Sequence, residues 1–185
     1  ETRMGTPMYG DRMDDIKPVI QPGGSDSAAL DNLFEVMVGE ERNLPMVKAL
    51  LIPESWAERE TMPKAHRDLY SYCNSVMEPW DGPAAICGFA GNWAIAGLDR
   101  NGLRPLRYTI TGNGLLLAGS ETGMVKVNEA QVVEKGRLGP GQMIAPVLSR
   151  GKLYRHHEIL DELAAPQDFG EWVKRITVID DLVRS

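Results

Sequence analysis

The residues 21–37, QPGGSDSAALDNLFEVM, place an acid between two serines directly before an apolar-periodic run. Ser25 or Ser27 could cap a helix here, and the two preceding glycines suit a tight turn. No capping box is expected, because neither serine has Glu or Gln three residues later. Asp26 would lie at the positive end of this helix, where an ionised carboxylate can accept hydrogen bonds from an ammonium group. The pattern alone favours a helix cap and leaves a site for a ligand's amine as the alternative.

A second polar stretch, LDRNGLRPLRY at residues 98–108, carries three arginines around the turn Asn101-Gly102. It is not a calcium loop, because Gly102 would stand at position four and Ile110 at position twelve. A turn whose arginines pair with nearby acids is expected in preference to a phosphate site. The glycine-rich segments GNGLLLAG and GRLGPG lack the strand, GxGxxG and helix order of a dinucleotide site.

Other candidate groups have simple structural interpretations. His156, His157 and Asp161 could be metal ligands, but a solvated helix face with an i,i+4 pair is the preferred interpretation. Cys73 and Cys87 are expected to be small buried apolar residues, since no His or Asn arrangement in the sequence marks either as a nucleophile. The residues alone therefore predict no metal site and no catalytic residue.

The composition excludes several functions. A chain of 185 residues can bury a core of its own, so one domain is expected. The net charge of −6 argues against nucleic acid or an anionic membrane as the main partner. Two cysteines are too few for a disulfide scaffold, which favours a reducing compartment. The longest apolar runs are too short for a membrane span, and the first residue, Glu1, suggests a processed chain or a fragment.

The elements expected to position these residues are helices first and hairpins afterwards. Apolar periodicity predicts a helix from Ser27, a second from Asn43 that stops at Pro53, and a third from Pro63 to about Ser75. Strands are predicted within residues 84–99, 107–120, 131–138, 142–148 and 152–155, with turns at Gly91-Asn92, Asn113-Gly114 and residues 139–141. A helical stripe is predicted from Asp168, with Phe169, Trp172, Val173, Ile176 and Val183 on one face. This order favours an α+β sandwich over a parallel βαβ fold.

Several blocks together resemble one family. In chain order they are GGSDSAALDNLFEVMV, LPMVKALLIPESW, YCNSVMEPWDGPAAI, LDRNGLRPLRYTIT, GSETGMVKV and EKGRLGPGQMI. They are similar to the C-terminal part of the amidotransferase domain of the glutamate synthase family, a class II glutaminase of the N-terminal-nucleophile type. The resemblance extends over nearly all of residues 1–185, and it implies an α+β, αββα glutaminase fold that is incomplete because its N-terminal half is missing.

The resemblance also implies a chemistry. In this family an N-terminal cysteine attacks the side-chain amide of glutamine, its own α-amine serves as the base, and an Asn-Gly pair supplies oxyanion-hole donors. None of these groups is found in this sequence, which has no NGE block and only internal cysteines. Asp26 of GGSDS is the position that carries over, as the group that contacts the α-amino group of glutamine. No catalytic residue and no metal ligand is assigned, and the chain alone is expected to be inactive.

The remaining expectations also follow from the resemblance. The full enzyme would be cytoplasmic and would use FMN, an iron-sulfur cluster and NADPH or ferredoxin, with no cofactor in this chain. Its partners would be glutamine, the remaining domains of the large subunit and an electron-delivering small subunit, with no nucleic acid and no membrane. The alternative is a non-catalytic remnant of an amidotransferase domain that binds an amino acid or a partner protein.

Overall fold

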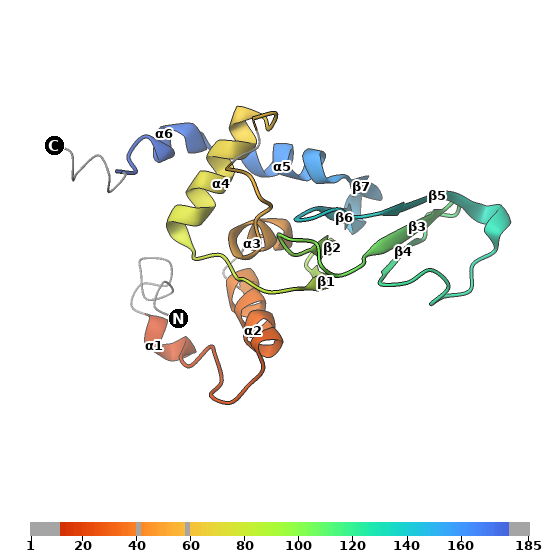
Figure 1. Ribbon diagram of the computed structural model, residues 1–185, viewed down its shortest axis with the longest axis horizontal. Helices are drawn as coiled ribbons and strands as arrows, with labels where there is room; N and C mark the ends of the chain where they lie inside the picture. The colour runs from red at the N-terminus through yellow and green to blue at the C-terminus, as the bar shows by residue number, and fades with distance from the viewer. Residues whose placement is uncertain (1–11, 40–41, 58–59, 178–185) are drawn as a thin grey trace.

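A computed structural model describes residues 12–39, 42–57 and 60–177 (Figure 1). The helices of its first half are α1 (Met13–Ile16), α2 (Asp26–Gly39), α3 (Leu44–Leu51) and α4 (Lys64–Val76). After the strands come α5 (His156–Ala164) and α6 (Phe169–Val173). None of the helices in these ranges is both long and apolar enough to cross a lipid bilayer.

The helices begin where local signals place them. The Asn43 side chain accepts a hydrogen bond from the Met46 amide at 2.8 Å, and Pro45 occupies the first turn of α3, where no amide donor is needed. α3 is buried almost throughout its length. The three helices predicted from residues 27, 43 and 63 are therefore confirmed, with boundaries that differ by one or two residues.

Two antiparallel sheets follow. Sheet A has the order β1-β2-β6-β7 and consists of β1 (Ala85–Ala90), β2 (Trp93–Leu98), β6 (Met143–Val147) and β7 (Lys152–Tyr154). Sheet B has the order β4-β3-β5 and consists of β3 (Arg107–Thr111), β4 (Leu116–Gly119) and β5 (Val132–Arg137). Two of the predicted turns have the left-handed backbone that favours glycine, with φ of 57° at Gly91 and 84° at Gly114. The predicted strands and these two hairpins are confirmed.

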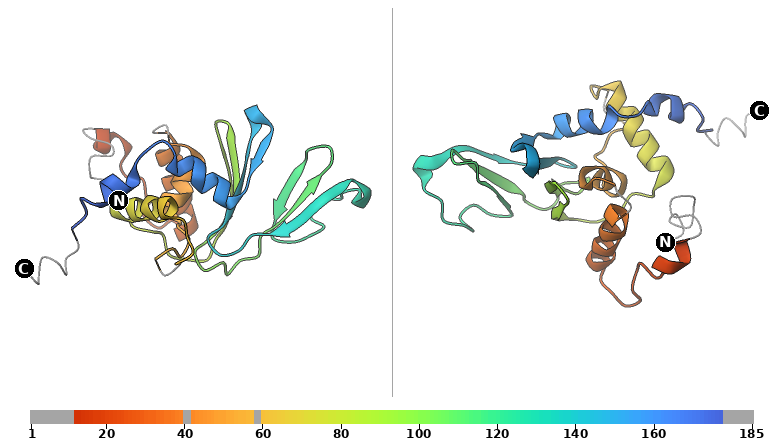
Figure 2. Two further views of the ribbon diagram at one scale, coloured as in Figure 1. Left: turned by 90° about the horizontal axis from the view of Figure 1, so that it is seen from above. Right: turned by 180° about the vertical axis from the view of Figure 1, so that it is seen from behind.

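The core divides into two clusters. The larger lies between the helices and sheet A, and includes Met37, Leu51, Leu69 and Leu160. The smaller joins the two sheets and consists of Ala96, Leu98, Leu106, Leu138 and Ile144. The helices gather over sheet A in Figure 1, and the two sheets diverge from each other in Figure 2. The described residues thus form a helical layer and two sheets, which confirms the predicted α+β class.

Two expectations need correction. The helical stripe from Asp168 ends early, because α6 stops at Val173, and Ile176 is 42% exposed; Val183 lies outside the described residues. Cys73 is buried as predicted, but Cys87 is exposed. The physical reason is that the side chains of β1 alternate between the two faces of the sheet, and Cys87 lies with Ala85 and Phe89 on the exposed face.

Candidate functional site

The segment before α2 forms a tight turn that ends in a serine cap. Gly23 has φ of 80°, and the Gly24 amide donates to the carbonyl of Gln21 at 3.1 Å. The hydroxyl of Ser25 accepts a hydrogen bond from the Ala28 amide at 3.2 Å. Of the two serines considered, Ser25 is therefore the N-cap of α2.

Asp26 follows the cap and is exposed. Its Oδ1 accepts a hydrogen bond from the Ser27 amide at 2.8 Å. Because this contact is made to the neighbouring backbone, the carboxylate remains accessible to further donors. The geometry is compatible with binding of an ammonium group, and the role of Asp26 stays a prediction.

A trough of about 470 Å³ runs along α2 beside the edge strand β1. One wall is α2 from Ser27 to Val38, and the other is the segment from Ala84 to Ala90. The trough therefore begins one residue after Asp26. Its volume is within the range of small-molecule sites, roughly 300–1,000 Å³.

Neither cysteine has the environment of a nucleophile. Burial raises the pKa of the Cys73 thiol to about 12. Although Cys87 is exposed as a residue, partial desolvation of its thiol raises the pKa of Cys87 above its ordinary value. Activated cysteines instead have a lowered pKa, because the thiolate is the reactive form.

The histidine pair at the start of α5 differs from the expected solvated face. His156 is buried, and its Nε2 lies 2.7 Å from Oε1 of Glu54. Asp161 contacts His66 of α4 at 2.6 Å and makes no i,i+4 pair on its own helix. The expectation was wrong for His156 and for the i,i+4 pair, because α5 packs its first turn against other elements, whereas His157 and Asp161 are exposed as expected. Within residues 12–39, 42–57 and 60–177, no three His, Cys, Asp or Glu side chains gather in a group that could hold a metal ion.

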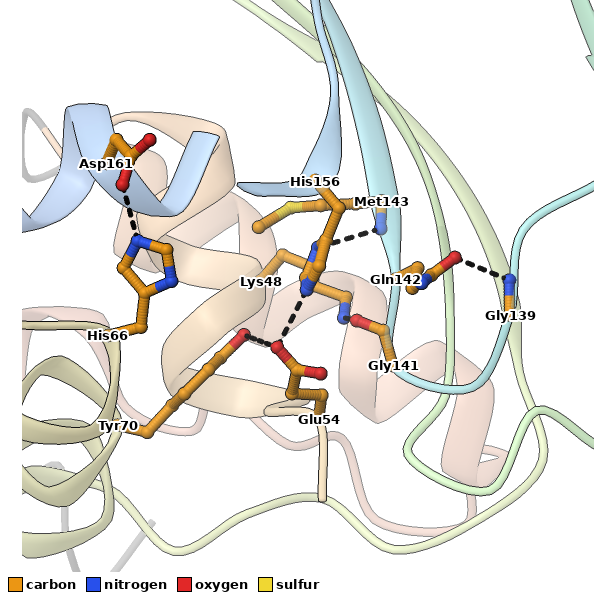
Figure 3. Close-up of polar contacts among 10 residues, drawn as sticks. All are labelled: Lys48, Glu54, His66, Tyr70, Gly139, Gly141, Gln142, Met143, His156 and Asp161. Carbon is orange, nitrogen blue, oxygen red and sulfur yellow. Dashed lines mark hydrogen bonds and ion pairs between the residues drawn. The ribbon is translucent and has the colours of Figure 1, made fainter. Parts of the chain in front are cut away.

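The buried end of His156 belongs to a polar cluster under sheet A, drawn in Figure 3. The Met143 amide donates to Nδ1 of His156 at 3.4 Å, so Nε2 carries the proton and donates to Glu54. The Tyr70 hydroxyl donates to the same Glu54 oxygen at 3.3 Å. Burial lowers the pKa of His156 and is opposed by the hydrogen bond and the charge of Glu54.

Lys48 of α3 completes this cluster. Its side chain is fully buried, and Nζ donates to the Gly141 carbonyl at 2.5 Å. Burial lowers the pKa of Lys48 to about 7, although the negative charges of Glu54 and Asp99 act in the opposite direction. Local sequence patterns predicted neither Lys48 nor Glu54 as part of a buried cluster. The available signal was a single lysine inside the apolar run PMVKALLI, followed closely by a glutamate.

The turn rich in arginine is organised by an acid. Asp99 accepts hydrogen bonds through Oδ2 from the amides of Asn101 and Gly102, at 3.0 and 3.1 Å. Arg100, Arg104 and Arg107 are exposed and form no ion pair with another described residue. The predicted pairing of these arginines with nearby acids was therefore wrong, because Asp99 is occupied by backbone donors.

Known proteins match this chain over its length. The family model for class-II glutamine amidotransferases matches residues 1–172. The NADPH glutamate synthase large chain of Azospirillum brasilense is 56% identical over 185 residues, which is 100% of this chain and 12% of that protein. The NADPH glutamate synthase large chain of Bacillus subtilis is 39% identical over 90% of this chain and 11% of its own length. Ferredoxin-dependent glutamate synthase 2 of Arabidopsis thaliana, a chloroplastic protein, is 38% identical over 94% of this chain and 11% of its own length.

The chain thus spans about an eighth of the length of these relatives. The family match covers far more than half of its residues, and it agrees with the mixed α+β architecture and its two antiparallel sheets. The chain belongs to the class-II glutamine amidotransferase family.

Proposed function

We propose that this chain is the C-terminal part of the glutaminase domain of a glutamate synthase, and that Asp26 binds the α-amino group of glutamine. The observation that carries the proposal is the exposed Asp26 carboxylate at the start of α2, in a chain that matches the class-II family. An ammonium group is the natural partner of such a carboxylate, which accepts but cannot donate hydrogen bonds.

The reaction would proceed in two stages. Hydrolysis of the glutamine side-chain amide gives glutamate and ammonia through an enzyme-bound thioester on an N-terminal cysteine of the family type. The two cysteines of this chain do not fit that role, since burial raises the pKa of both thiols. Ammonia then condenses with the keto group of 2-oxoglutarate with loss of water, and two electrons and two protons reduce the resulting imine to a second glutamate.

The electron carriers would belong to other parts of the protein. The names of the relatives specify NADPH or ferredoxin as donors, and FMN and an iron-sulfur cluster are part of the same proposal. A cysteine-ligated cluster needs four thiolates in most proteins, and this chain has two cysteines. The other large-subunit domains, a small electron-delivering subunit and a cytoplasmic location complete the proposal.

The test is the change Asp26→Ala in the full-length protein that carries this sequence. We expect the KM for glutamine to rise about 10- to 150-fold, the equivalent of the 1.5–3 kcal/mol of a charged hydrogen bond. Activity with added ammonia in place of glutamine should not change, because free ammonia bypasses the glutaminase step.

Ser25→Ala provides the matched control. It removes the helix cap next to Asp26 but leaves the carboxylate in place. If Asp26→Ala and Ser25→Ala alter the KM equally, Asp26 acts only through the helix start. An unchanged KM in Asp26→Ala would reject the proposal and favour a domain that does not use this carboxylate for binding glutamine.

A further inference from the structure

Three buried ionisable side chains lie where the helices meet sheet A, and the proposed function does not use them (Figure 3). Lys48 is 0% exposed, Glu54 2% and His156 6%. They come from α3, the segment that follows it, and the start of α5. Lys and Glu are rarely buried unless they are paired.

Burial of these groups is not explained by stability. Taking charges out of water costs several kcal/mol each, and well-packed apolar replacements are often neutral or stabilising. A retained buried charge can instead select one arrangement of the backbone around it. The partners of Lys48 show which arrangement is selected here.

Lys48 is connected by hydrogen bonds to a second loop and to the start of β1. Its Nζ donates to the carbonyl of Gly141 at 2.5 Å, and the Gly141 amide donates to the carbonyl of Asp99 at 2.7 Å. Asp99 in turn holds Ala84, because Oδ1 of Asp99 accepts from the Ala84 amide at 3.2 Å. The Asp99 amide donates back to the Ala84 carbonyl at 2.9 Å. This series of bonds joins α3 to the residue before β1.

Gly141 is fixed in the middle of this series. Its φ of 69° lies in the left-handed region, and a Cβ at this position would overlap the Cα and Cβ of Glu54. The close approach places the turn directly on the segment that carries Glu54. The Glu54 side chain is itself held by Tyr70 and His156. The turn therefore has little freedom to move relative to the helices.

Ala84 and Ala85 line the trough across from α2. The first residue of that helix is Asp26, and Ser27 lines the trough on the α2 side. If Gly141 moved, its hydrogen bond to Asp99 and those of Asp99 to Ala84 would move Ala84 with it. The distance between the two walls of the trough would then change.

We propose that Lys48 is a positioning residue, which holds the start of β1, one end of the trough wall across from α2, in place through Gly141, Asp99 and Ala84. The inference rests on the proposed function, in which Asp26 contacts glutamine. Lys48 does not touch the substrate, and its effect is on the geometry of the trough wall across from α2, the helix that begins with Asp26.

The test replaces Lys48 with Met, which keeps most of the buried volume and removes the donor. In the full-length protein we expect the KM for glutamine to rise roughly 3- to 10-fold, the size of effect seen for residues that couple through packed networks. The kcat with added ammonia should be unchanged. The melting temperature should fall, because the Gly141 carbonyl loses its buried donor and Glu54 loses a nearby positive charge.

Hydrogen exchange gives a readout that does not depend on glutamine. We expect the amides of Ala84 and Gly141 to exchange faster in Lys48→Met than in the wild type, while amides within α4 keep their protection. Lys64→Met is the matched control, because Lys64 is 81% exposed and pairs with Asp68 on the surface. That variant should match the wild type in both measurements.

Lys48→Gln retains an N–H donor on a shorter side chain, and its KM should lie between those of the wild type and Lys48→Met. If Lys48→Met does not fold, the Gln variant carries both measurements. Unchanged exchange at Ala84 and Gly141, or an unchanged KM beside a raised KM in Asp26→Ala, would overturn the inference. A third outcome is an unchanged KM in Asp26→Ala together with faster amide exchange in Lys48→Met. It would reject the proposed function but support the connection from Lys48 to Ala84.

Discussion

Asp26 and Glu54 are two carboxylates with opposite surroundings. Asp26 is exposed at a helix start and contacts the amide of the next residue at 2.8 Å. Glu54 is 2% exposed and accepts hydrogen bonds from Tyr70 and His156 of two different helices. The first carboxylate is accessible to a ligand, and the second is committed to the fold. Asp26 lies in a conspicuous motif but is expected to contribute little to stability. Glu54 lies in an ordinary stretch of sequence and is expected to contribute more.

The largest expected effect is at the buried acid. Glu54→Ala would leave the Nε2–H of His156 and the hydroxyl of Tyr70 without their acceptor and would remove a negative charge near Lys48, which we expect to lower the free energy of unfolding by about 3–5 kcal/mol. Chemical denaturation of the variant measures it. Glu129→Ala is the control, since Glu129 is 76% exposed beside Lys135 and should cost less than about 1 kcal/mol. Equal losses in the two variants would show that burial of Glu54 does not matter.

Gly141 tests how tightly the surroundings of the buried Glu54 are packed. Gly141→Ala combines a left-handed φ with an overlap on Glu54, whereas Gly151→Ala has φ of 57° and no atom within 4 Å of the new Cβ. We expect Gly141→Ala to lower the free energy of unfolding by about 1–3 kcal/mol more than Gly151→Ala does. Both variants place Ala at a left-handed φ, so the difference between them reflects overpacking against Glu54 alone. Thermal denaturation of both variants is sufficient. Equal losses of stability in the two variants would contradict the close contact between Gly141 and Glu54.

The buried lysine makes stability depend on pH. The pKa of Lys48 falls from 10.5 to about 7 on folding, so the unfolded chain binds more protons between these values. The free energy of unfolding should therefore rise with pH in that window, by up to about 1.4 kcal/mol per pH unit from this group. Lys48→Met should remove this part of the slope. Parallel slopes for the wild type and Lys48→Met in urea denaturation from pH 7 to 10 would contradict the shifted pKa.

The smallest effect is expected at the exposed acid. Ser25→Ala removes the cap of α2 and should cost about 0.5–2 kcal/mol of stability. Asp26→Ala should cost less, since Asp26 contributes only a local contact and a favourable position at the helix end. Denaturation curves of the two variants measure both losses of stability. A larger loss for Asp26→Ala would make it a structural residue.

Local signals in the sequence predicted most of the fold. Asn43 caps its helix through its own side chain, and Gly91 and Gly114 form their turns with their own backbone, so these features needed no distant contact. The buried cluster could not be predicted in this way. Lys48 meets Gly141 across 93 residues, and His156 meets Glu54 across 102. Asp26 was identified through the family resemblance, because a cap and a ligand contact share one local pattern.

The central claim is that Asp26 binds the α-amino group of glutamine. The most direct measurement compares glutamine with glutaramate, which is glutamine without its α-amino group, in the full-length wild-type protein and in Asp26→Ala. We expect the wild type to bind glutamine about 10- to 150-fold more tightly than glutaramate, the equivalent of one charged hydrogen bond. In Asp26→Ala the two ligands should bind with nearly equal affinity. The same preference for glutamine in both proteins would contradict the assignment of Asp26.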